Sequence, residues 1–203
     1  MPNDRPRPSC VWCMSTAPHY EPRYTVDDYR QWEGRWELWN GFAVSMTPSP
    51  FGRHAKALTD AAAAFKQAVD AAAAAAEACR AVVLTEIDWI VSRDTVVRPD
   101  LVVVCGGVPE RHVESPPAVV VEVLSTATRD RDRSIKKDLY LREGVAWYVM
   151  IDPDDGTTDL FERVGARGRE AWQRQATPDA AELIICEHCR LRVALGALSG
   201  PRP

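Results

Sequence analysis

A single carboxylate inside an apolar run is the feature that most constrains this chain. Ala118–Leu124 reads AVVVEVL, and Glu122 is the one charged residue in it. The run is rich in β-branched residues and lies between Pro116-Pro117 and Ser125-Thr126, so it predicts a short strand buried on both faces. An ionised carboxylate in such a strand costs several kcal/mol unless a cation or dense hydrogen bonding offsets that cost.

A second carboxylate precedes the neighbouring apolar strand. Val102–Val104 follows Arg98-Pro99-Asp100, so Asp100 opens that strand. Two acids on neighbouring buried strands suggest a site for a divalent metal. The plainer alternative is a carboxylate satisfied by backbone amides, which is common at strand ends, and position alone does not separate the two.

Composition limits the classes of function. The chain has 203 residues, of which 46% are hydrophobic, and this length predicts one domain with one sizeable core. Its net charge of −4 excludes a protein that holds nucleic acid by bulk charge, so nucleic-acid contact requires a local basic patch and a metal. No apolar segment approaches the length of a membrane span and the start MPNDRPRPSC lacks a signal core, so we expect a cytoplasmic protein without membrane contact.

The chain divides into a proline-rich arm, residues 1–23, and a single domain, residues 24–203. Thr25-Val-Asp-Asp28 has the form of a capping box, and the alternation around Asn40-Gly41 predicts a hairpin. An alanine-rich helix is expected over about 53–80. The other expected elements are strands at Val82–Val91, Thr95–Val104, Ala118–Leu124 and Ala146–Ile151, a helix at Arg131–Glu143, a hairpin of Thr158–Arg163 with Trp172–Thr177, and a last strand at 182–195. Tryptophans in the strands are interpreted as core residues.

Short motifs spread over residues 24–153 resemble one nuclease family. They are Arg35–Gly41 (RWELWNG), Pro48-Ser-Pro50 with His54, Arg98–Val104 (RPDLVVV), Val121–Ser125 (VEVLS), Thr128-Arg129, Asp132, Lys136, Leu139-Tyr140, Gly144-Val145, Trp147-Tyr148 and Asp152-Pro153. Together they are similar to the Uma-type restriction endonucleases, a branch of the PD-(D/E)XK nuclease superfamily. The resemblance implies an α/β, restriction-endonuclease-like core of order helix-strand-strand-strand-helix-strand, with one mixed sheet and β-hairpin additions at both ends.

The resemblance also implies site residues. Asp100 matches the aspartate of the Pro-Asp element and Glu122 the acid of the (D/E)XK element, and both would bind Mg²⁺ or Mn²⁺. The chain departs from the superfamily at Leu124, where that pattern has lysine. Lys136, on the following helix, occupies the place from which the family supplies the cation. Glu37 and His54 match positions expected to face the same catalytic pocket.

Each of these residues also has a plainer interpretation. Asp132 precedes Lys136 by one helical turn, which makes an ordinary ion pair. Lys137 is the alternative lysine. Glu37 could pair with a neighbouring arginine, and a single histidine such as His54 is more often structural than catalytic.

A basic stripe on the predicted helix suits a phosphate-bearing substrate. Helical spacing puts Arg129, Arg133 and Tyr140 on one stripe with Lys136, and these three are the expected substrate-binding residues. Ile135 and Leu139 fall on another stripe that should meet the sheet. A solvated charged face is the alternative.

The cysteine spacing suggests a structural zinc site. Cys10/Cys13 and Cys186/Cys189 are two Cys-x-x-Cys pairs that would bind Zn²⁺ and join the arm to the last strand, with His188 able to replace one thiolate. Cys79 and Cys105 are interpreted as ordinary buried thiols. The zinc site lies outside the matched motifs, and independent dithiols are the alternative.

The sequence therefore predicts a Mg²⁺-dependent endonuclease that hydrolyses DNA phosphodiester bonds. Two alternatives stay open: a nucleic-acid-binding or protein-binding module with little turnover, and a hydrolase acting on RNA or nucleotides. The sequence leaves the oligomeric state open, with a homodimer among the options.

Overall fold

The structure is a computed structural model that describes residues 23–46, 52–76, 79–126, 129–176 and 179–198. The predicted arm, apart from Arg23, lies outside these residues, as does the motif at 48–50. Within the described part, no helix is both long and apolar enough to cross a membrane.

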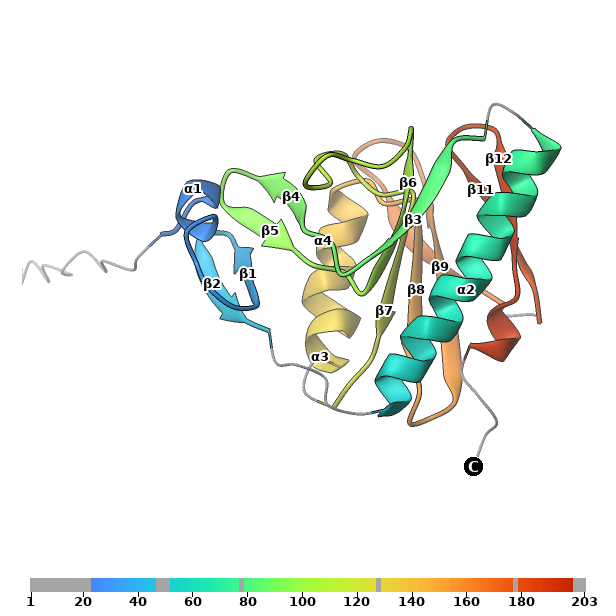
Figure 1. Cartoon of the computed structure of the whole chain (residues 1–203), viewed down its shortest axis with the longest axis horizontal. Coiled ribbons are helices and arrows are strands. Elements are labelled where there is room, and N and C mark those ends of the chain that lie inside the picture. The colour runs from blue at the N-terminus through green and yellow to red at the C-terminus, as the bar shows by residue number, and fades with distance from the viewer. Residues whose placement is uncertain (1–22, 47–51, 77–78, 127–128, 177–178, 199–203) are drawn as a thin grey trace, which may run out of the picture.

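A six-stranded mixed sheet forms the centre of the molecule (Figure 1). All neighbouring strands are antiparallel except β7 and β8, which are parallel. Its order is β10 (Ala171–Gln175), β9 (Thr157–Val164), β8 (Trp147–Asp152), β7 (Val119–Val123), β6 (Leu101–Cys105) and β3 (Ala81–Thr85). Every residue of β7 and β8 is buried, including Glu122 and Asp152, and the largely apolar sequences of both strands predict this burial.

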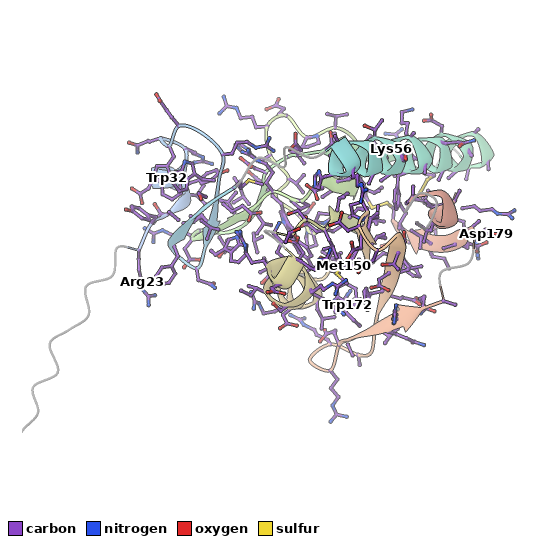
Figure 2. The ribbon with its side chains drawn as sticks, turned by 90° about the horizontal axis from the view of Figure 1, so that it is seen from below. Arg23, Trp32, Lys56, Met150, Trp172 and Asp179 are labelled. Carbon is purple, nitrogen blue, oxygen red and sulfur yellow. A yellow bond between two sulfur atoms is a disulfide. The ribbon has the colours of Figure 1, made fainter. Side chains whose placement is uncertain are left out.

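Helices cover both faces of this sheet (Figure 2). Helix α2 (Gly52–Ala75) packs on one face through a stripe of small residues, Phe65 and Val69. The other face is covered by a helical segment made of α3 (Arg129–Arg131), η1 (Asp132–Lys136) and α4 (Lys137–Arg142). Because side chains alternate along β7, Val121 and Val123 face α2, whereas Val120 and Leu124 face α4.

A small second sheet lies beside the main one (Figure 1). It joins β2 (Phe42–Ser45), β1 (Trp36–Trp39), β5 (Thr95–Val97) and β4 (Trp89–Ser92), with the short helix α1 (Val26–Tyr29) beside β1. The predicted capping box is present, and the Asn40-Gly41 turn has positive φ at both residues (49° and 85°), as a two-residue hairpin requires.

The two long strands predicted at 82–91 and 95–104 are each divided. The chain turns at Glu86 (φ 50°), and Pro99, which has no N–H to donate to a ladder, separates β5 from β6. Strands β4 and β5 therefore join the small sheet, while β3 and β6 stay in the main one. This division places Arg98, Pro99 and Asp100 where the two sheets meet.

The C-terminal strand predicted at 182–195 is a hairpin of β11 (Ala181–Ile185) and β12 (Cys189–Val193), followed by the 3-10 turn η2 (Leu195–Ala197). Cys186 and Glu187 reverse the chain with φ of 47° and 66°. The hairpin packs beside α2 on the same face of the sheet, and its apolar residues join the larger core.

The predicted zinc site is wrong, because its C-terminal thiols are used elsewhere. Cys189 forms a disulfide with Cys79, and Cys186 forms one with Cys105. The hairpin folds back against α2 and β6, which brings together cysteines 110 and 81 residues apart. Cys79 and Cys105 are therefore not free thiols, and Cys10 and Cys13 lie outside the described residues. Disulfides are rare in the cytosol, so this pair weighs against the cytoplasmic expectation.

Candidate active site

The structure gathers the five predicted catalytic residues around one cavity of about 250 Å³. They come from separate elements: Glu37 from β1, His54 from α2, Asp100 from the start of β6, Glu122 from β7 and Lys136 from η1. Met150 pairs with Glu122 in the β7–β8 register. It is labelled in Figure 2, where the sheet lies between α2 and the helical segment on the other face.

Glu122 is buried and hydrogen-bonded by two donors. Its Oε1 accepts from Lys136 Nζ at 3.0 Å and from Tyr140 Oη at 2.6 Å. Since Val121 and Val123 face α2, Glu122 points to the opposite face, toward the helix that carries both donors. Burial raises the pKa of Glu122 well above its usual range, while the positive charge of Lys136 opposes that rise.

Lys136 is the cation of the site. Its Nζ lies 3.2 Å from Glu37 Oε1 and 3.7 Å from Asp132 Oδ1, in addition to its contact with Glu122. Burial works to lower the pKa of Lys136, but these carboxylates outweigh it and raise the pKa well above the usual value. The lysine is therefore protonated and acts as a fixed positive charge.

Asp100 is held at the start of β6 by two contacts. Its Oδ2 accepts from the Val123 backbone N–H at 2.7 Å and lies 3.4 Å from His54 Nε2. The hydrogen bond to Asp100 raises the pKa of His54, against the effect of partial burial. Among the described residues, the other Asp100 oxygen, Oδ1, accepts no hydrogen bond.

Glu37 ties the small sheet to this site. Its Oε1 accepts the Arg98 backbone N–H at 2.8 Å, and its side chain is almost fully buried. The carboxylate therefore bridges the Arg98-Pro99-Asp100 turn and Lys136. This contact explains why a residue from a distant hairpin belongs to the cavity.

None of the three expected substrate-binding residues lines the cavity, so the predicted basic stripe does not face it in the described structure. Arg129 and Arg133 both contact Asp152, at 3.1 and 3.2 Å, and hold the helix to the end of β8. Tyr140 is completely buried and donates to Glu122. The reason is the π-helical turn of η1, whose wider hydrogen-bonded loop changes the phase of the helix.

Sequence reasoning missed part of the cavity wall. Asp132, which is among the family motifs and was interpreted as an ion-pair partner but not as a site residue, is buried and lines the cavity. Other lining residues that were not expected are Arg35, Glu86, Arg98 and Arg131. The i,i+4 spacing of Asp132 and Lys136 was the available signal. No sequence signal places Arg35 beside Glu86, with which it forms an ion pair across the two sheets.

The mixed sheet, the helix on each face and the acids on adjacent strands define a restriction-endonuclease-like fold of the PD-(D/E)XK type. A crystal structure from Anabaena variabilis, titled as a putative nuclease belonging to DUF820, is similar over 87% of this chain and 97% of that one, with a TM-score of 0.65 and 17% identity. Residues 26–194 match the Uma2 family, described as "Putative restriction endonuclease", and the chain belongs to this family. No curated protein matches the chain.

Proposed function

We propose that the protein is a divalent-metal-dependent endonuclease that hydrolyses DNA phosphodiester bonds. The observation that carries the proposal is the pair of carboxylates, Asp100 and Glu122, that line one cavity beside the buried cation Lys136. Membership in the Uma2 family supports a nuclease, and the acid-rich cavity supports a metal.

The donor set fits Mg²⁺ or Mn²⁺. In the described residues, no group of three or more His, Cys, Asp or Glu side chains is arranged to hold a metal ion. Mg²⁺ does not need such a group, since it usually takes one or two carboxylates together with waters and substrate phosphate oxygens. Asp100 and Glu122 each keep one carboxylate oxygen without a hydrogen bond in the described structure, and these oxygens would hold the ion.

A metal held there would acidify a bound water and stabilise charge on the phosphate. The protein's own groups prepare the site. His54 and the Val123 amide orient Asp100, while Tyr140 and Lys136 orient Glu122. Lys136 also keeps a positive charge beside the place where the phosphate would become more negative. Arg35 and Arg131 line the same cavity and would contact the phosphate.

Cleavage of plasmid and oligonucleotide DNA, with Mg²⁺ or Mn²⁺ and with EDTA, tests the proposal. Asp100→Asn and Glu122→Gln should each lower the rate at least about 100-fold, because each removes a carboxylate from the metal. Lys136→Ala should lower the rate while Mn²⁺ binding, measured by calorimetry, stays near the wild-type value. Lys137→Ala, one residue along the helix, is the matched control.

Cleavage that survives Glu122→Gln or EDTA would contradict the mechanism. A binding module without turnover is the alternative, and the absence of lysine two residues after Glu122 favours it. That alternative requires nucleic-acid binding without cleavage under every metal condition.

Parallel RNA substrates separate an RNA hydrolase from the DNA endonuclease. Size-exclusion chromatography with light scattering tests the homodimer, which is a prediction from function alone.

A further inference from the structure

A second groove adjoins the catalytic cavity on the side of the small sheet. It has a volume of about 470 Å³. We call it the aromatic groove and define it by Tyr29, Arg30, Trp32, Gly34, Trp36, Asp88, Arg98, Arg111 and His112. The small sheet lies beside the main sheet, and Trp32 lies within the small-sheet unit (Figures 1 and 2).

Arg98 forms the wall between the aromatic groove and the catalytic cavity, because it lines both. Its backbone N–H donates to Glu37, a residue of the cavity. Its guanidinium donates to Asp88 at 2.7 Å and to Tyr29 Oη at 3.3 Å, both in the groove. The groove and the cavity are therefore neighbours, and one partly buried hydrogen-bond network connects them.

Three aromatic rings line the groove, and each keeps part of its surface exposed. Trp32 meets Tyr29 and Trp36 edge-on, with centroid distances of 5.5 and 5.9 Å and interplanar angles of 66°. It also meets Tyr24 edge-on at 5.0 Å, so the ring of Trp36 has fewer aromatic neighbours than that of Trp32. An edge-on contact occupies only one face of one ring in each pair. Trp36 is also fixed in place, because its indole N–H donates to the Glu33 carbonyl at 2.8 Å. This arrangement differs from the core role expected for strand tryptophans.

The unpaired charge beside these rings favours an anion. Arg30 and Arg111 are both exposed, and Arg30 pairs with Asp27 at 3.0 Å. Asp88, the acid among the groove residues, is neutralised by its ion pair with Arg98. In the described structure Arg111 forms no ion pair, so its guanidinium is available to a ligand.

We propose that the aromatic groove binds an unpaired nucleotide of a single-stranded nucleic-acid segment next to the phosphodiester bond in the catalytic cavity. The base stacks on the exposed indole surface, and Arg111 contacts the adjoining phosphate. Stacking on aromatic side chains beside basic residues is how single strands are bound without sequence preference, whereas the bases of a closed duplex are already stacked on each other. This inference rests on the proposed nuclease function, since it assigns that site a substrate with unpaired bases.

Binding of a fluorescein-labelled oligo(dT), measured by anisotropy in EDTA so that no cleavage occurs, tests the inference. Trp36→Leu and Arg111→Glu should each weaken binding about tenfold, within the range expected for loss of one stacked base or one phosphate contact. The matched controls are Trp172→Leu, a half-buried strand tryptophan whose indole also donates to a backbone carbonyl, and Arg192→Glu on the C-terminal hairpin. Both controls should bind as the wild type does. Circular dichroism confirms that each variant is folded.

Two further measurements separate this inference from the proposed function. Glu122→Gln should not cleave, yet it should bind oligo(dT) as tightly as the wild type. A fully paired duplex of the same length should bind more weakly than oligo(dT). Trp36→Leu should not change the affinity for this duplex. Wild-type affinity for oligo(dT) in both groove variants would overturn the inference, even if the enzyme cleaves DNA. Groove-dependent binding without cleavage would overturn only the nuclease proposal.

Discussion

At the residue scale, the site depends on one lysine that serves three carboxylates. Lys136 contacts Glu122, Glu37 and Asp132, and all four side chains are almost completely buried. Removing the cation leaves negative charges in a region of low polarity, which costs more than the loss of a surface ion pair. The same lysine therefore supports both the fold and the proposed chemistry.

Lys136→Met should lower the free energy of unfolding by about 3 kcal/mol at neutral pH in EDTA. Glu122, whose pKa is already raised by burial, then binds its proton more tightly in the folded state than in the unfolded chain. When the pKa of an acid is higher in the folded protein than in the unfolded chain, the free energy of unfolding falls as the pH increases from the unfolded pKa to the folded pKa. The defect should therefore be smaller at about pH 5 than at about pH 8.

Urea denaturation of the variant and the wild type at both pH values measures this effect. Lys137→Met is the control, because Lys137 is partly exposed and lies over the Phe161 ring instead of among carboxylates. A Lys136→Met defect that is no larger than the control's would contradict the role of Lys136 as the buried cation.

At the element scale, the π-helical turn decides which side chains reach the site. A regular α-helix over 129–142 would turn Ile135 and Leu139 together toward the sheet. In the structure Leu139 is buried, whereas Ile135 is 55% exposed and Lys136 takes the inward position. A π-turn often occurs at functional sites. Here it directs Lys136 toward the core and leaves the side chain of Ile135 exposed to solvent.

Ile135→Gln should change the free energy of unfolding by no more than about 0.5 kcal/mol, because the side chain contacts mainly water. Leu139→Ala should cost about 2–5 kcal/mol, since it removes methyl groups from the core beside α4. Thermal and urea unfolding of the two variants measures both effects. An Ile135→Gln defect as large as that of Leu139→Ala would mean that the helix is regular and that Ile135 is buried.

At the scale of the whole molecule, two disulfides attach the C-terminal hairpin to α2 and β6. They differ in access: Cys79 and Cys189 are buried, whereas Cys105 is exposed. The candidate active site lies near the N-terminal end of α2, and Cys79 follows the other end of this 24-residue helix. Cys105 ends β6, at the opposite end of that strand from Asp100. Stability and activity should therefore respond differently to reduction.

Mild dithiothreitol should reduce Cys105–Cys186 before Cys79–Cys189, as followed by alkylation and mass spectrometry. Full reduction should lower the free energy of unfolding by about 2–5 kcal/mol per bond, because each bond restricts a long loop of the unfolded chain. Nuclease activity below the melting temperature should persist after reduction. Loss of activity in folded, reduced protein would indicate that the hairpin acts on the site.

The elements with local signals could be predicted from the sequence. The capping box at Thr25, the Asn40-Gly41 turn, the alanine-rich helix and the buried strands around Glu122 all follow from short patterns of propensity and polarity. Asp100 and Glu122 were also identifiable, because a charged residue in or beside an apolar strand requires an explanation.

How these elements combine could not be predicted from the sequence and follows from the folded structure. The division of two long strands between two sheets, the π-turn that turns Lys136 inward and the pairing of Cys186 and Cys189 with distant cysteines all depend on contacts between remote segments. Such contacts are selected by the packing of the whole core, and a local pattern carries no information on the partner. For the same reason, the aromatic groove beside Arg98 appears only once the small sheet is folded against the main one.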